Sequence, residues 1–253
     1  YVTFDAIDIE DAASNTNGTM QMEYAFAIVK ASVTDGSQHV TITNCVLTLN
    51  KQNPGAAAIY QNNHTTSSTA DLVITNATGA SSHNSFSNTY FGIYVAGASN
   101  DTAYYDHNVD ISGNSISNWA GGPGTTYGIY TVYQDFFRIA NNTLNGVTNH
   151  TGIIYGIYAS TATNASYEVT ENTVTIASNS LTGTLYGIYI TSGASGTANI
   201  ATIANNAVTG CSIPNATSGG FYGVYHSSSE YTLNMHGNSV TNNAVGGGAG
   251  AKA

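Results

Sequence analysis

The tyrosines of this chain are spaced in a way that suggests a binding surface. Six of them end a short motif, aromatic–Gly–aliphatic–Tyr or a close variant, that recurs every 28 to 36 residues: Tyr60, Tyr94, Tyr130, Tyr158, Tyr189 and Tyr225. A tyrosine ring offers a flat apolar face and a hydroxyl, which suits contact with sugars or with another polypeptide. If the motifs lie on stacked strands, the rings are about 4.8 Å apart. The spacing therefore predicts a tyrosine stripe that either stiffens a sheet by stacking on itself or forms a platform for a ligand or partner.

Side chains suited to acid–base catalysis or metal binding are sparse. Arg138 is the only arginine, and Asp135 and Glu168 are the carboxylates expected within a turn or two of it. Polysaccharide cleavage needs convergent carboxylates and a proton donor or acceptor, and the chain has no Asp-Asp or Gly-His-Gly motif. Its seven histidines lack zinc-binding spacings. The sequence favours a protein with no catalytic residues, no metal and no cofactor, with a lone site around Arg138 as the alternative.

An acidic cluster and two cysteines have simple structural readings. The cluster comprises Asp5, Asp8, Glu10 and Asp11. Carboxylates bind Ca²⁺, but the alternation of residues 1–10 predicts a strand that carries them on its solvent face. Cys45 and Cys211 should lie about five turns apart, roughly 24 Å at the spacing of stacked strands, which is too far for a disulfide. We expect both thiols to be buried and free.

A second repeated motif, Ile-x-x-Asn-x-aliphatic, alternates with the tyrosine motif. Its asparagines are Asn114, Asn142, Asn172, Asn206 and Asn238. Both motifs are short, rich in Ile, Val, Thr and Tyr, and bounded by Gly, Ser, Asn and Thr, as strands are. No window shows helical periodicity. Repeats of about 30 residues without helices predict an all-β solenoid of seven to eight parallel coils, in which each coil buries its apolar residues against its neighbours.

The motifs resemble those of right-handed parallel β-helices, the pectate-lyase-like solenoids, and in particular Asn-rich repeats of secreted surface proteins from Bacteroidetes-type bacteria. The segments that carry the resemblance surround Asn114 (Val-Asp-Ile-Ser-Gly-Asn-Ser-Ile) and Asn172 (Glu-Val-Thr-Glu-Asn-Thr-Val) and recur over residues 40–245. The resemblance implies a right-handed parallel β-helix. It implies little about activity, because unrelated functions share this fold.

Stacking converts each repeat position into a ladder of like residues. The asparagines should form a structural ladder at a sharp turn, each in the left-handed region, with amides bonded from coil to coil. Aligning Ile42 with Ile111 puts Cys45 at the asparagine position of an earlier coil. The motif glycines should leave the outer face bare beside each tyrosine. Three inward ladders are expected: Ile59, Ile93, Ile129, Ile157, Ile188 and Val224; Ile111, Ile139, Val169, Ile203 and Met235; and Ile116, Leu144, Val174, Val208 and Val240.

Three segments are less regular. Residues 23–33 suit a strand better than a helix, and in the coil before Tyr94 either Asn76 or Asn88 takes the turn while Phe86 competes with Val73 for the inward position. Residues 1–245 are expected to form one domain. The Gly- and Ala-rich residues 246–253 are expected to form a tail or linker.

Composition limits the possible partners. Charged residues make up 7% of the chain, and the net charge is −10 with only four Lys and Arg residues. This balance argues against nucleic acid as a partner, and no apolar run is long enough to span a membrane. The low Lys content and the abundance of Asn, Thr and Ser suit an extracellular or cell-surface protein. The first residue is Tyr1, so the chain resembles a processed or excised piece.

Two functions are consistent with these features. The first is a non-catalytic secreted or cell-surface module, structural or adhesive, that is part of a longer surface protein or associates with itself into a fibre. The second is a protein that binds or degrades a surface polysaccharide.

Overall fold

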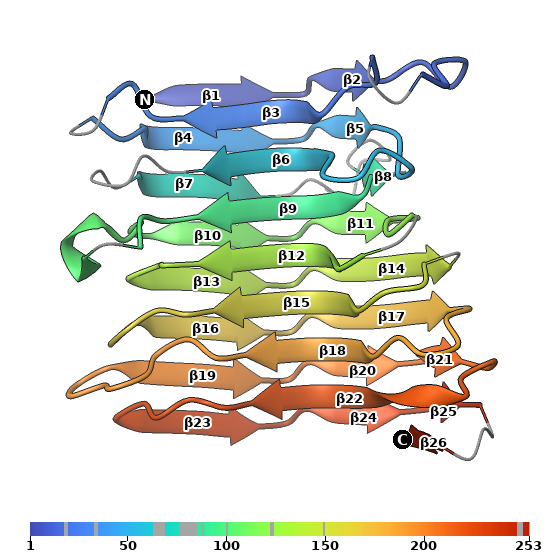
Figure 1. Cartoon of the computed structure of the whole chain (residues 1–253). Coiled ribbons are helices and arrows are strands. Elements are labelled where there is room, and N and C mark those ends of the chain that lie inside the picture. The colour runs from blue at the N-terminus through green and yellow to red at the C-terminus, as the bar shows by residue number, and fades with distance from the viewer. Residues whose placement is uncertain are drawn as a thin grey trace.

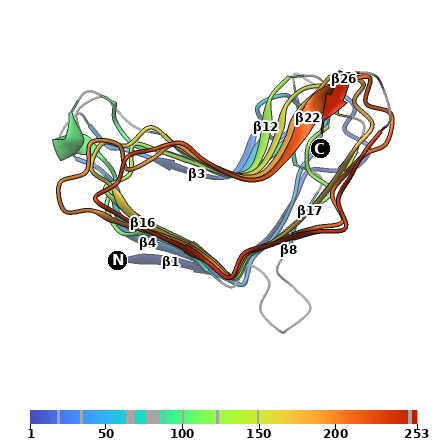
Figure 2. The ribbon, with the colours of Figure 1, turned by 90° about the horizontal axis from the view of Figure 1, so that it is seen from below.

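The chain folds into a right-handed parallel β-helix, as the sequence predicts (Figures 1 and 2). The computed structural model describes residues 1–17, 20–32, 35–62, 69–75, 85–87, 89–99, 101–121, 124–148, 150–246 and 250–252. Three parallel sheets run along the axis, and successive turns supply successive strands of each sheet. Among the described residues, the only helical segment is the single 3-10 turn η1 (Thr102–Tyr104), and no helix is suited to crossing a membrane.

The strands of each sheet follow the order of the turns. The first sheet contains β1 (Val2–Asp5), β4 (Gln38–Thr43), β7 (Ala70–Thr75), β10 (Val109–Ser112), β13 (Phe136–Ala140), β16 (Ser166–Thr170), β19 (Ile200–Ala204) and β23 (Thr232–His236). The second contains β2 (Asp8–Glu10), β5 (Val46–Thr48), β8 (Ser85–Ser87), β11 (Ser115–Ser117), β14 (Thr143–Thr148), β17 (Thr173–Ser178), β20 (Ala207–Thr209) and β24 (Ser239–Thr241), with β21 (Ser212–Ile213) and β25 (Ala244–Val245) beside them. The third contains β3 (Tyr24–Val29), β6 (Ala57–Asn62), β9 (Phe91–Ala96), β12 (Thr126–Val132), β15 (Ile154–Ser160), β18 (Leu185–Ile190), β22 (Ser218–His226) and β26 (Gly250–Lys252).

The three predicted inward ladders line the interior, except in the last turns. Their members from Ile59 to Val208 are fully buried. At the end of the stack, Met235 is 45% and Val240 47% exposed, and Val224 is only partly buried. The prediction that these residues are buried is wrong for Met235 and Val240, because β23 and β24 are the last described strands of their sheets and so have a neighbouring strand on one side only. Burial in a parallel solenoid depends on having a neighbour on both sides.

The irregular segments are resolved in part. Residues Tyr24–Val29 form strand β3, as expected. Phe86 takes the inward position in the second sheet and is fully buried, whereas Val73 lies on the outer side of β7. Asn76 and Asn88, the alternative turn residues, lie outside the described residues. Within the segment expected to be a tail, Gly250–Lys252 forms β26 and pairs with Ser218–Gly220 of β22.

The corner between the first and second sheets is the sharp turn seen end-on in Figure 2. The prediction that the ladder asparagines adopt left-handed conformations is wrong by one residue. The left-handed position is the residue before each of them: Gly113, Asn141, Glu171, Asn205 and Gly237, with φ between 55° and 68°. The residue before each ladder asparagine therefore turns the chain, which leaves the asparagine itself free to point its amide into the corner.

The amides of the ladder asparagines are bonded from turn to turn, as predicted. The side-chain oxygen of Asn172 accepts hydrogen bonds from the backbone nitrogen (3.0 Å) and the side-chain nitrogen (2.9 Å) of Asn142. The side-chain nitrogen of Asn172 donates to the carbonyl of Ile139 (2.9 Å) and to the side-chain oxygen of Asn206 (3.0 Å). The pattern links Asn114, Asn142, Asn172, Asn206 and Asn238. These bonds satisfy polar groups that would otherwise be buried without partners.

Both cysteines occupy asparagine-like positions. The Cys45 thiol lies 3.8 Å from the carbonyl of Phe4, the contact that corresponds to the ladder bond between Asn142 and Ile111. Cys211 contacts the carbonyl of Val174 at 3.6 Å, much as Asn243 of the next turn contacts Val208. Both thiols are free and buried, and burial raises the pKa of Cys211 to about 11.

The third sheet bends inward along its middle, so that its outer side is concave (Figure 2). The alternation of inward and outward residues is interrupted at the motif glycines, where two consecutive residues are buried in β12 and β15. The prediction that these glycines face outward is wrong. A β-carbon on Gly128 would lie 2.5 Å from Leu144, and one on Gly156 would lie 2.7 Å from Val174. The same contact joins Gly92 to Ile116, Gly187 to Val208 and Gly223 to Val240. Each glycine thus faces the interior, where an aliphatic side chain of the second sheet occupies the space that a β-carbon would need.

Candidate functional site: the tyrosine face and its pocket

The six predicted tyrosines lie on the outer side of the third sheet and in one register column. The strand pairing places Tyr60 beside Tyr94, Tyr130 beside Tyr158, and Tyr189 beside Tyr225. Each side chain is partly buried. The structure therefore forms the predicted stripe of tyrosines along the axis of the helix.

The structure adds a second column that the sequence analysis missed. Strict alternation points the first aromatic residue of each motif inward, but two consecutive residues, such as Gly128 and Ile129, face the interior. Tyr127 and Tyr130 consequently lie on the same outer side, with ring centroids 4.6 Å apart. The second column consists of Tyr24, Phe91, Tyr127, Tyr155, Tyr186 and Tyr222. We call the outer side of the third sheet with both columns the tyrosine face.

Rings on the tyrosine face pack against one another in a nearly continuous array. Tyr189 and Tyr225 stack at 4.6 Å with planes 4° apart, and Tyr155 and Tyr186 stack at 4.8 Å with planes 8° apart. Edge-on pairs cross between the columns, as at Tyr186 and Tyr189, whose planes are 80° apart. Parallel neighbours occupy much of each other's ring faces. The surface offered to solvent is therefore made largely of ring edges and hydroxyls.

Burial raises the pKa of several phenols on the tyrosine face, among them Tyr127 and Tyr130. Desolvation, with smaller contributions from neighbouring tyrosines, raises the pKa of Tyr127 to about 12. The pKa of Tyr130 is also raised, first by desolvation and then by Tyr94 and Tyr127. These phenols act as neutral hydrogen-bonding groups at neutral pH.

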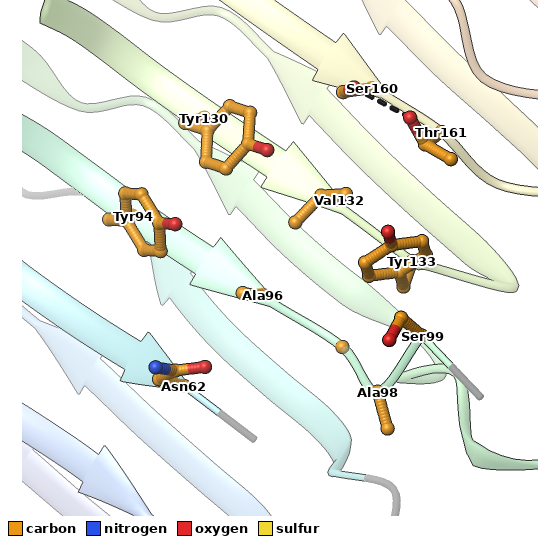
Figure 3. Close-up of a pocket in the computed structure, with 11 residues that line it drawn as sticks. Asn62, Tyr94, Ala96, Ala98, Ser99, Tyr130, Val132, Tyr133, Ser160 and Thr161 are labelled. Carbon is orange, nitrogen blue, oxygen red and sulfur yellow. Dashed lines mark hydrogen bonds between the residues drawn. The ribbon is translucent and has the colours of Figure 1, made fainter. Parts of the chain in front are cut away.

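A pocket of about 320 Å³ adjoins the tyrosine face where β9, β12 and β15 end (Figure 3). Tyr94 and Tyr130 form one side, and their hydroxyls point toward the strand ends in Figure 3. The rest of the lining is small or hydroxylated: Asn62, Ala96, Gly97, Ala98, Ser99, Val132, Tyr133, Ser160 and Thr161. None of these residues carries a charge. The pocket thus combines aromatic rings with neutral hydrogen-bonding groups.

A buried ion pair is bonded to Tyr133, one of the lining residues, and was not anticipated from the sequence. Lys30 and Asp106 are 3.5 Å apart, with side chains 1% and 0% exposed. Asp106 also accepts hydrogen bonds from the backbone of Thr69 (2.8 Å) and the side chain of Gln134 (3.3 Å). Its own backbone nitrogen donates to the carbonyl of Tyr133 at 3.1 Å. Separating this ion pair would leave an uncompensated buried charge, so Asp106 is held firmly in place. Because the backbone of Asp106 is bonded to Tyr133, the network also fixes the turn that contains Tyr133.

The other candidate groups do not converge on a site. Arg138 lies on the outer side of the first sheet, 3.2 Å from Asp110 and 3.6 Å from Glu168, and Asp135 pairs instead with His107 at 2.9 Å. The acidic residues Asp5, Asp8 and Glu10 are exposed, as the strand alternation predicts. Within the described ranges, no three His, Cys, Asp or Glu residues are grouped to hold a metal ion.

Comparison with known proteins adds nothing to these observations. No protein-family model, curated protein or solved structure matches the chain. The parallel β-helix is established by the strand pairing itself.

Proposed function

We propose that this protein is a non-catalytic module of a secreted or cell-surface protein, and that the tyrosine face adheres to an uncharged polysaccharide. We also propose that it is related to the pectate-lyase-like solenoids and to secreted surface proteins of Bacteroidetes-type bacteria. The observation that carries it is the double column of rings, an extended, uncharged surface that follows the axis of the helix.

The chemistry of the face suits a polymer of neutral sugars. Hydroxyls at ring edges donate and accept hydrogen bonds, and the rings provide apolar surface between them. A bent sheet gives a linear ligand more contact than a flat one. With a net charge of −10, the chain repels acidic polymers, so a neutral polysaccharide is the ligand of choice.

Ionisable groups support a non-catalytic role. Arg138 is neutralised by Asp110 and Glu168 on the outer side of the first sheet rather than on the tyrosine face. The Glu230 carboxylate lies between Tyr167 (2.7 Å) and His226 (3.0 Å), and its side chain is 1% exposed. Carboxylates in such pairs serve structure more readily than proton transfer to a large substrate.

Retention on insoluble polysaccharides tests this function. The purified chain should be retained on at least one of cellulose, chitin, xylan or mannan, and Tyr155→Ala/Tyr158→Ala should weaken retention at least tenfold. The matched control is Tyr231→Ala, which removes a tyrosine that is 70% exposed but outside the tyrosine face. Circular dichroism verifies that each variant keeps its β structure. Failure of the wild-type chain to bind any of the four would overturn the proposal.

Self-association is a second candidate, favoured by the exposed end of the stack. Leu233 and Met235 on β23 are 42% and 45% exposed. Following the register along the first sheet puts Met235 in line with Phe4, and His236 in line with Asp5. A second copy stacked head to tail would therefore bury apolar residues against each other and bring a carboxylate beside an imidazole.

Light scattering after size-exclusion chromatography tests this stacking. The molar mass should rise with protein concentration, and Met235→Glu should return it to that of one chain. Ile200→Glu is the control. Ile200 is similarly exposed, at 52%, but it lies on β19, which is separated from the end of the stack by β23. A concentration-independent mass of one chain would exclude the stacking.

A further inference from the structure

The backbone around the pocket adopts conformations that its residues do not favour. Tyr133 has φ 56° and Thr161 has φ 34°, and both side chains line the pocket. Positive φ is an outlier for bulky and β-branched residues, whereas asparagine and glycine adopt it readily. Among the described non-glycine residues, asparagine fills seven of the fourteen positive-φ positions, and Thr161 is the only β-branched residue there.

The two residues lie in neighbouring turns and are tied together. The backbone nitrogen of Tyr133 donates to the carbonyl of Thr161 at 3.1 Å. The buried ion pair of Lys30 and Asp106 holds the turn that contains Tyr133, since the backbone nitrogen of Asp106 donates to the carbonyl of Tyr133. Strained positions that the surroundings hold in place are typical of ligand sites. Tyrosine and threonine thus stand where the rest of the chain mostly uses asparagine or glycine.

Hydroxyl groups form a connected row along the rim. Ser160 donates to the Tyr158 hydroxyl at 3.1 Å and lies 3.0 Å from the Thr161 hydroxyl. Across the pocket, Asn62 donates to the Tyr60 hydroxyl at 2.6 Å. Such hydroxyls can donate to one ligand oxygen while accepting from another. This pattern suits a ligand whose own groups are hydroxyls.

We propose that the pocket binds a single neutral pyranose unit, with one sugar face against Tyr94 and Tyr130 and its hydroxyls on Ser160, Thr161 and Tyr133. The volume of about 320 Å³ is at the lower end of the range for small-molecule sites. The described lining residues are uncharged and would disfavour an acidic sugar, whose carboxylate would be desolvated beside them without a cation. The inference rests on the proposed polysaccharide adhesion and assigns this pocket as the site that selects the sugar.

Saturation-transfer NMR with four soluble probes tests the pocket: the methyl glycosides of glucose, galactose, mannose and N-acetylglucosamine. At least one should receive saturation from the wild-type chain. Thr161→Gly removes a rim hydroxyl, so the affinity for that probe should fall at least tenfold. Because glycine tolerates the positive φ, Tm should stay the same or rise. Tyr133→Phe keeps the ring and should weaken binding severalfold.

Ser195→Gly is the matched control, because Ser195 is exposed, has φ 59° and lies outside the pocket. This change should leave sugar binding unaltered and not lower Tm. The inference is overturned if none of the four probes binds, if Thr161→Gly binds as well as wild type, or if Thr161→Gly lowers Tm. Retention on polysaccharide without any glycoside signal refutes the pocket alone, whereas glycoside binding without retention refutes the adhesive function of the tyrosine face.

Discussion

Replacing Asn172 by leucine should lower the free energy of unfolding by about 3–5 kcal/mol, since it strands two buried donors at a cost of about 1–3 kcal/mol each. The donors are the backbone N–H and one of the two side-chain N–H groups of Asn142, which is 1% exposed; the other side-chain N–H keeps its bond to Ile111. The substitution also removes the donor to Ile139 and the bond to Asn206. Leucine has nearly the same bulk, so the loss reports hydrogen bonding rather than a cavity.

Equilibrium denaturation in urea measures this effect. The single tryptophan, Trp119, is fully buried and provides the fluorescence signal. The control is Asn145→Leu, at an exposed position on β14 in the neighbouring turn, where a surface substitution changes stability by about 0.5 kcal/mol or less. Equal midpoints for the two variants would show that the amide ladder does not stabilise the fold.

Gly156→Ala should destabilise the protein by about 2–3 kcal/mol through overpacking. The added methyl would lie 2.4 Å from the carbonyl oxygen of Gly187 and 2.7 Å from Val174. The first of these contacts is with backbone, so no change of side-chain rotamer relieves it. The sheet would have to move outward at Gly156, which would also separate the two tyrosine columns.

The first turns provide the comparison for this substitution. Ala58 occupies the equivalent position in β6, between Ala57 and Ile59, which pair with Phe91 and Ile93. Ala58→Gly removes a methyl without creating a clash and should cost only about 1 kcal/mol. Ultraviolet circular dichroism of the tyrosine bands reports the array in each variant. A Gly156→Ala protein as stable as the Ala58→Gly protein would contradict the packing at the motif glycines.

The repeats were sufficient to predict the fold, because stacking depends on periodicity more than on fine geometry. Equivalent positions such as Asn142 and Asn172 do lie over one another, and the aliphatic positions from Ile59 to Val208 are buried. Two local errors share a cause. Alternation and turn propensity assign each residue separately, whereas the left-handed turn at Asn141 and the inward glycine at Gly156 depend on what lies opposite in the next turn.

The site was only half predictable for the same reason. Strict alternation hides Tyr127 inside the coil, and only the interrupted alternation at Gly128 brings it beside Tyr130. Asp106 and Lys30 are 76 residues apart, so no local pattern indicates that they pair. A usable signal was nevertheless present: an aromatic residue on both sides of a recurring Gly-aliphatic pair suits a kinked strand better than a flat one.

The repetition of the same motifs in successive turns has a consequence for folding. Tyr-Gly-Ile-Tyr occurs unchanged at residues 127–130, 155–158 and 186–189, and Asn114, Asn142 and Asn172 each donate the same hydrogen bond to the ladder asparagine of the next turn. During folding, a turn can therefore pair with a copy of the motif one turn too far along the chain and still form the same contacts. Only the entropic cost of closing the longer connecting loop disfavours this wrong pairing. The order of assembly is thus guarded by connectivity rather than by side-chain recognition, so slow escape from misthreaded stacks should dominate the recovery of this molecule from denaturant.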